Sequence, residues 1–165
     1  MIIGIPKEIK LQEHRIGLTP DSVKVLTDKG HEVLVENNGG FEAGFGNENY
    51  KNVGEKIIEK AEESFKEAEL IVKVKEPQTE EVNMIRENQI IYTYLHLAAA
   101  KELTKGLIKS KSICIAYETV TDDSGRLPLL APMSAVAGRM SVQAGAHCLE
   151  KNQKGRGLLL GGAPG

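Results

Sequence analysis

The stretch 70-LIVKVKEPQTEEVNMIRENQIIYTYL-95 decides the fold class of this chain. It contains two short apolar runs, 70–74 and 90–95, and the segment between them predicts a short helix over 79–87. Apolar runs of this length are typical of buried strands. A strand, a helix and a second strand in succession form the unit that joins parallel strands. The stretch therefore predicts a sheet with parallel strands.

The same alternation extends through the rest of the chain. Further strands are predicted over 1–5, 31–36 and 112–117. Further helices are predicted over 20–30, about 53–67, 99–110 and 131–151. This order favours an α/β fold: a mostly parallel, flavodoxin/Rossmann-like sheet with helices on both faces. The long helix at 131–151 is predicted to be a connecting element that follows the sheet.

Two helices carry clear end signals. Thr19 suits the N-cap of the first, Pro20 suits its first turn, and Gly30 suits its C-terminal end. The last helix begins at Pro132 and is rich in Ala, Gly and Ser. Each glycine inside it weakens an isolated helix by about 1 kcal/mol relative to alanine. We therefore expect this helix to need a packing partner and the chain to self-associate.

Composition excludes several classes of protein. The 165 residues are 41% hydrophobic and 27% charged, which is ordinary for a globular protein. The formal net charge of -2 gives no electrostatic basis for binding nucleic acid. No apolar run reaches the length of a membrane span, and "MIIGI" at 1–5 is unlike a secretory signal, so a cytoplasmic location is expected. Cys114 and Cys148 lack metal-site spacing and are expected to be buried free thiols.

Three side chains follow predicted strands at positions where they could form a site. Arg15 lies in the loop after the first strand, Lys75 follows 70–74, and His96 follows 90–95. Ligands of parallel α/β sheets bind outside the carboxyl ends of the strands. Arg can clamp a carboxylate, Lys can polarise a carbonyl oxygen, and His can transfer a proton near neutral pH. The set suits a small oxo-acid.

Each of the three residues has an ordinary alternative role. Arg15 could lie in a solvated loop beside Glu13, Lys75 could share a wet strand face with Lys73, and His96 could be a core histidine between two leucines. The glycine-rich segment 39–46 offers no nucleotide site, because it matches neither the dinucleotide fingerprint nor a P-loop. The pattern of residues alone leaves these alternatives open.

Longer motifs carry a resemblance to a known family. The segments "GIPKEIKLQEHRIGLTPDSVKVL", "GFGNENY", "IVKVKEP", "IIYTYLHLAA", "YETV", "LPLLAPMSAVAGRMSVQAGAHCLEK" and "GRGLLLGGAPG" resemble alanine dehydrogenases, in order and over the whole chain. Transhydrogenase alpha subunits share the opening and the "VKVKEP"-like strand but lack "YLHLAA". A transhydrogenase-like domain is therefore the second reading, and a non-catalytic binding or oligomerisation module is the third.

The resemblance implies NAD-dependent conversion of L-alanine to pyruvate and ammonia, and the reverse. Arg15 and Lys75 would hold the substrate, and His96 would be the catalytic acid and base. The family's pattern also implies pocket residues Tyr94, Leu130 and Met133, a cofactor contact at Ser134, a homo-oligomer and no metal.

The resemblance further implies a division of the chain. Residues 1–128 would be a substrate-binding domain, incomplete without a later segment, and 129–165 would be the connecting helix and the start of a nucleotide-binding domain. On this reading the chain is an N-terminal fragment, inactive by itself.

Overall fold

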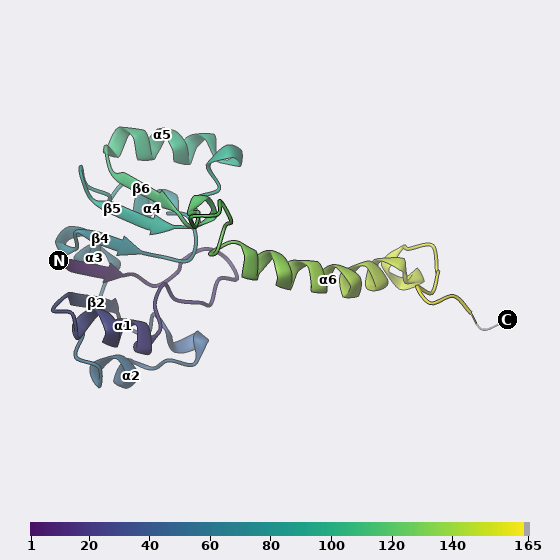
Figure 1. Ribbon diagram of the computed structural model, residues 1–165, viewed down its shortest axis with the longest axis horizontal. Helices are drawn as coiled ribbons and strands as arrows, with labels where there is room; N and C mark the ends of the chain where they lie inside the picture. Colours follow the sequence, from purple (N-terminus) through teal and green to yellow (C-terminus); the bar gives the residue numbers. More distant parts are fainter. Residues whose placement is uncertain (164–165) are drawn as a thin grey trace. The chain divides into compact units, whose positions relative to one another are not determined.

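The computed structural model describes residues 1–163, and six parallel strands form a sheet within residues 1–119 (Figure 1). The strands are β1 (Ile2–Ile5), β2 (Glu32–Glu36), β3 (Lys56–Ile58), β4 (Leu70–Val72), β5 (Ile90–Thr93) and β6 (Ile113–Ala116). Their order in the sheet is β3-β2-β1-β4-β5-β6, and every neighbouring pair is parallel. The predicted α/β class with a parallel sheet is confirmed.

Helices cover both faces of the sheet, as predicted. Their bounds are α1 (Pro20–Thr27), α2 (Asn47–Lys51), α3 (Ala61–Glu67), α4 (Thr79–Val82), α5 (Lys101–Ser110) and α6 (Ala131–Leu149). Short 3-10 turns lie at Phe41–Ala43, Leu97–Ala99, Tyr117–Thr119 and Lys151–Gln153. At the start of α1, the Thr19 hydroxyl accepts a hydrogen bond from the Ser22 amide, which confirms the predicted N-cap.

The core consists of two apolar clusters. Ile3 and Ile5 of β1 pack with Val23 of α1 and Tyr50 of α2. Phe65 of α3, Leu107 of α5 and strand residues Ile71 and Ile91 form the other cluster. Successive side chains of a strand point to opposite faces, so a central strand such as β4 supplies both clusters through Ile71 and Val72. Burial on both sides explains why these strands are short apolar runs.

Two helix predictions were wrong. Residues 53–67 do not form one helix: Gly54 has φ +87, β3 follows it, and α3 begins only at Ala61. The adjacent pair Ile57 and Ile58 lacks the spacing of a helical face and instead belongs to an edge strand that pairs with β2. The helix expected over 79–87 is shorter, because α4 ends at Val82.

Gly4 allows α3 to lie close against β1. A Cβ atom on Gly4 would be 2.1 Å from the Ser64 Oγ and 2.9 Å from the Ile71 Cδ1. We expect Gly4→Ala to lower the free energy of unfolding by about 1–3 kcal/mol, the usual cost of overpacking. Ser64→Ala removes the worst clash and a buried hydroxyl without a hydrogen-bond partner. Urea unfolding should therefore show part of the loss recovered in the double variant; a Gly4→Ala protein as stable as the parent would contradict this packing.

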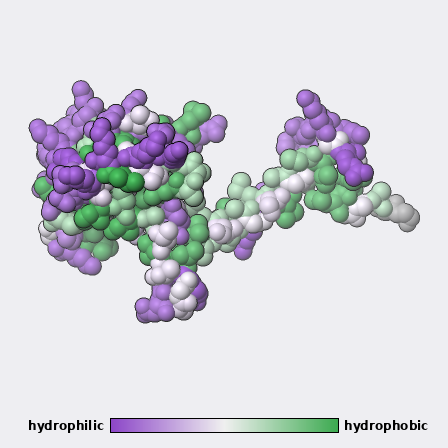
Figure 2. All heavy atoms as spheres, turned by 90° about the horizontal axis from the view of Figure 1, so that it is seen from above, coloured by the Kyte–Doolittle hydropathy of each residue, from purple (hydrophilic) through white to green (hydrophobic). Residues whose placement is uncertain are grey.

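The chain divides into two compact units, Met1–Thr119 and Val120–Gly165. The second unit contains a turn closed by Asp122 and Arg126, and the long helix α6. Small and apolar side chains follow one another along α6, pale to green in Figure 2, and Val136, Met140 and Val142 are exposed. Self-association through this helix stays a prediction, as does the expected domain boundary after residue 128.

The remaining expectations concern thiols and membranes. Cys114 and Cys148 are both free, but Cys114 is only half-buried and Cys148 is exposed, so the expected burial was wrong. Cys148 lies near the end of α6, a helix in which no residue is buried. In residues 1–163 no helix is long and apolar enough to cross a membrane, and no group of three or more potential ligands could hold a metal ion.

Candidate active site at the carboxyl edge of the sheet

The sheet reverses its strand order between β1 and β4. The chain builds β1, β2 and β3 outward in one direction and then returns to place β4 on the other side of β1. The loops that follow β1 and β4 therefore leave the sheet side by side at its carboxyl edge, which is where ligands bind in open parallel sheets. Arg15 lies in the first of these loops, Lys75 in the second, and His96 in the loop after the neighbouring strand β5.

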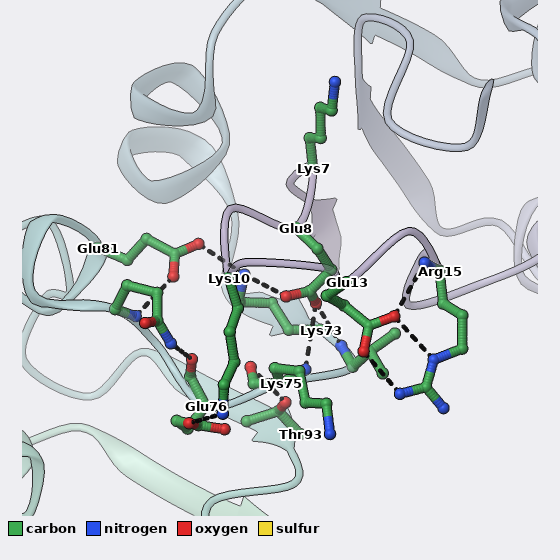
Figure 3. Close-up of polar contacts among 12 residues, drawn as sticks. Lys7, Glu8, Lys10, Glu13, Arg15, Lys73, Lys75, Glu76, Glu81 and Thr93 are labelled. Atoms are coloured by element: carbon green, nitrogen blue, oxygen red, sulfur yellow. Dashed lines mark hydrogen bonds and ion pairs between the residues drawn. The ribbon is translucent and has the colours of Figure 1, made fainter. Parts of the chain in front are cut away.

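A buried ion cluster joins the first two loops (Figure 3). The Lys73 ammonium is fully buried and lies 2.6 Å from a Glu81 carboxylate oxygen and 3.2 Å from one of Glu8. Buried charges are tolerated when they are paired and hydrogen-bonded in this way. Burial raises the pKa of Glu81 above its ordinary value, against the effect of the neighbouring ammonium. Lys73 thus does not share a wet strand face with Lys75, because β4 is covered on both sides.

Glu8 also fixes the backbone that carries Lys75. Its second carboxylate oxygen accepts hydrogen bonds from the amides of Val74, at 2.6 Å, and Lys75, at 3.2 Å. The Thr93 hydroxyl donates to the Lys75 carbonyl oxygen at 2.9 Å. The half-buried Lys75 side chain makes no hydrogen bond or ion pair within residues 1–163. A fixed backbone thus presents an ammonium that remains available to a ligand.

Arg15 is held by Glu13, two residues before it. The Glu13 carboxylate accepts from the Arg15 Nε at 2.8 Å, from its Nη2 at 2.6 Å and from its backbone amide at 2.9 Å. These bonds from Arg15, with a smaller contribution from Lys75, lower the pKa of Glu13 to about 2. Arg15 is therefore exposed in a loop and also paired with Glu13, as one alternative from the sequence had it.

His96 and Tyr94 lie together after β5. Their rings stack with centroids 6.4 Å apart, and Tyr94 also meets the ring of Tyr117 edge-on. His96 is exposed and adopts φ 49, ψ 37, a left-handed conformation that is uncommon for residues other than glycine. The alternative of a core histidine is therefore wrong: the chain turns outward directly after Leu95, which is buried.

Glu118 holds that turn in place. Its carboxylate accepts from the amides of His96, at 2.8 Å, and Leu95, at 3.1 Å. Partial burial acts in the opposite direction, but these amide donors keep the pKa of Glu118 below its ordinary value. Beside the His96 ring lies a recess of about 380 Å³, lined mainly by the small or apolar residues 97–99 and Ala116.

The other predicted residues lie in the second unit. Leu130 precedes α6, and Met133 and Ser134 lie in its first turn. Their contacts with substrate or cofactor stay predictions. Of the carboxylates that organise the site, sequence analysis noted only Glu13, as a neighbour of Arg15, and missed Glu8, Glu81 and Glu118. Only the pairing of Glu13 with Arg15 could be expected from the sequence, because the two residues lie two positions apart in the same loop.

Comparison with known proteins places the chain in a family. Residues 4–137 match the family model described as alanine dehydrogenase/PNT, N-terminal domain. The chain belongs to this family. An alanine dehydrogenase of Halomonas elongata is 53% identical over all 165 residues, which cover 44% of that protein, and one of Geobacillus stearothermophilus is 50% identical with the same coverage. The chain thus spans less than half the length of these alanine dehydrogenase relatives.

Solved structures agree. A structure of an L-alanine dehydrogenase has a TM-score of 0.86 and 49% identity, and the match covers 99% of this chain and 45% of that one. A transhydrogenase from Sinorhizobium meliloti has a TM-score of 0.70 at 22% identity, over 75% of this chain and 35% of that one. The second likeness shows a shared fold alone. The resemblance to alanine dehydrogenases found in the sequence is confirmed.

Proposed function

We propose that this chain forms the substrate-binding part of an NAD-dependent alanine dehydrogenase, which converts L-alanine to pyruvate and ammonia and catalyses the reverse reaction. The observation that carries the proposal is the origin of Arg15, Lys75 and His96. They come from the loops after β1, β4 and β5, which are three adjacent parallel strands, and hence from one edge of the sheet. Membership of the family supports the choice of reaction.

Two cations suit the two polar ends of pyruvate. The Arg15 guanidinium has donors beyond those that Glu13 uses, and it would bind the carboxylate. The Lys75 ammonium, free of other partners in residues 1–163, would bind the keto oxygen. In the direction of amination, negative charge grows on that oxygen while ammonia attacks, and a fixed ammonium stabilises it.

His96 would transfer the proton. Its ring is exposed at the carboxyl edge, stacked on Tyr94, and its backbone is fixed by Glu118. As general acid, His96 would protonate the carbinolamine oxygen that leaves as water during amination, and as general base it would take a proton back in the reverse direction. Tyr94, Leu130 and Met133 would line the pocket around the methyl group.

NAD itself does not fit the described part of this chain. At the β1 end of the switch point, a dinucleotide-binding sheet has a tight glycine turn into a helix. Here the long loop 6–19 follows β1 in place of such a turn. We therefore assign the nucleotide site to chain beyond the sheet described here, with Ser134 as the contact from this side.

The two other readings have less support. A transhydrogenase shares the fold at only 22% identity, whereas alanine dehydrogenases reach 50–53% identity over the whole chain. A non-catalytic binding or oligomerisation module would retain the pocket but would not need His96 for proton transfer. We also propose a cytoplasmic homo-oligomer that acts on a small molecule and binds neither nucleic acid nor membrane; the net charge of -2 and the small-residue face of α6 support this.

An activity comparison tests the proposed function. A polypeptide of the relatives' length that carries this sequence at its start is expected to reduce NAD in the presence of L-alanine, measured at 340 nm. The 165-residue chain alone is expected to show no such activity, because the sheet in residues 1–163 has no dinucleotide-binding turn after β1. Alanine-dependent NADH formation by the short chain, or its absence from a folded long polypeptide, would contradict the proposal.

A further inference from the structure

The Glu13 carboxylate is much less accessible than the guanidinium it binds. Its side chain is 7% exposed, whereas that of Arg15 is 53% exposed. In Figure 3, Glu13 lies on the side of Arg15 that is turned toward Glu8. A nearly buried carboxylate beside two proposed substrate-binding cations calls for an explanation, since it offsets part of the positive charge that an anionic substrate needs.

The geometry of the pair shows which donors remain. Glu13 contacts Arg15 side-on, through Nε and Nη2, in two parallel hydrogen bonds. The Nη1 atom makes no hydrogen bond within residues 1–163. A guanidinium has five N–H donors in a fixed plane, so side-on pairing leaves the edge formed by Nη1 and the outer hydrogen of Nη2. That edge can accept a second carboxylate in bidentate fashion.

The loop holds Glu13 in one place. The Glu13 amide donates to the Lys10 carbonyl oxygen at 3.0 Å, and Gln12 just before it adopts φ 64. The third bond, from the Arg15 backbone amide to the same carboxylate, ties side chain and main chain of the pair together. Because the pKa of Glu13 is lowered to about 2, the carboxylate stays ionised at every pH at which the protein would be assayed.

We propose that Glu13 is a positioning residue that clamps the Arg15 guanidinium side-on and so presents its Nη1/Nη2 edge to the substrate carboxylate. This inference rests on the proposed function. Without the clamp, Arg15 is an exposed side chain with several rotamers, and binding must then fix it at an entropic cost. The gain in orientation has to exceed the loss of attraction caused by the negative charge of Glu13.

Charge and orientation predict opposite results for Glu13→Gln. This change removes the negative charge and places an amide NH₂ opposite the donors of Arg15. If orientation dominates, pyruvate binds about tenfold more weakly; if charge dominates, it binds more tightly. Glu13→Asp keeps the carboxylate one methylene shorter and should retain affinity to within about threefold. Glu42→Gln is the matched control, because Glu42 is an exposed neighbouring carboxylate whose partner is His14 rather than Arg15.

The test combines pyruvate titration by calorimetry with NMR of the Arg15 Nε–Hε group in the protein without ligand. We expect a distinct, slowly exchanging Arg15 Nε–Hε signal in the parent, Glu13→Asp and Glu42→Gln proteins. In Glu13→Gln, we expect this signal to merge with those of arginine side chains that are exposed to solvent. The dissociation constant for pyruvate should rise about tenfold only in Glu13→Gln.

The outcomes separate the two proposals. Unchanged or tighter pyruvate binding by Glu13→Gln would overturn the clamp and leave the proposed function standing. An unchanged Nε–Hε signal in Glu13→Gln would overturn the clamp as well. The proteins compared are polypeptides of the relatives' length, and failure of the folded parent to bind pyruvate would overturn the proposed function and, with it, the role of Glu13 in orienting Arg15 for substrate.

Discussion

Replacing Lys73 with methionine is expected to lower the free energy of unfolding by about 3–5 kcal/mol, the usual cost of removing one partner from a buried ion pair. Lys73 is fully buried, and its ammonium lies within hydrogen-bond distance of both Glu8 and Glu81. Methionine matches the length of the lysine stem but leaves two buried carboxylates facing each other without a cation. The loops after β1 and β4 would then lose the contact that joins them.

Urea unfolding followed by circular dichroism measures this loss. Lys105→Met is the matched control, because Lys105 forms an exposed pair with Glu102 on α5 and its loss should cost no more than about 0.5 kcal/mol. Adding Glu81→Gln to Lys73→Met should recover part of the stability by removing one of the unpaired charges. Equal midpoints for Lys73→Met and Lys105→Met would contradict the buried cluster.

Replacing His96 with asparagine is expected to lower kcat/KM for alanine about 10²–10⁴-fold, the range for loss of a general acid–base group. Asparagine is chosen because His96 has φ 49, a left-handed conformation that asparagine tolerates better than other side chains. The carboxylate-binding residues are untouched, so the dissociation constant for pyruvate should change by no more than a few-fold. The assay uses a polypeptide of the relatives' length.

His31→Gln serves as the control for this prediction. His31 lies just before β2, at the opposite end of the strands, and contacts the N-terminal amine. It should leave the rate within twofold of the parent. If His96→Asn and His31→Gln both have the rate of the parent, another group transfers the proton and the assignment of His96 is wrong.

Much of the fold could be predicted from the sequence because the strands are buried on both faces. Such strands appear as isolated apolar runs, as in 70–74 and 90–95. The edge strand β3 has only three residues and one buried side chain, Ile58, so it lacks that signal, and its sequence predicts a helix instead. The order of the strands in the sheet comes only from the structure. The sequence of a parallel crossover does not reveal which strands it places side by side.

The candidate site was predictable only in part. The position of Arg15, Lys75 and His96 directly after strands sufficed to group them at one edge. The burial of Lys73 could not be predicted, because "VKVK" alternates like a strand with one wet face. Its two partners, Glu8 in the loop after β1 and Glu81 in α4, meet only in the folded chain. The carboxylates that support the cations therefore become apparent only once the topology brings distant segments together.

The most direct test of the account is a calorimetric titration of pyruvate into the parent protein, Arg15→Ala and Lys7→Ala. Lys7 is a cation from the same loop, and Figure 3 shows its side chain directed away from Arg15 and Lys75. We expect the parent and Lys7→Ala to bind pyruvate equally and Arg15→Ala to bind at least about tenfold more weakly, as for loss of a charged hydrogen bond. Equal binding by all three proteins, or no binding by the parent, would contradict a keto-acid site at the carboxyl edge of this sheet.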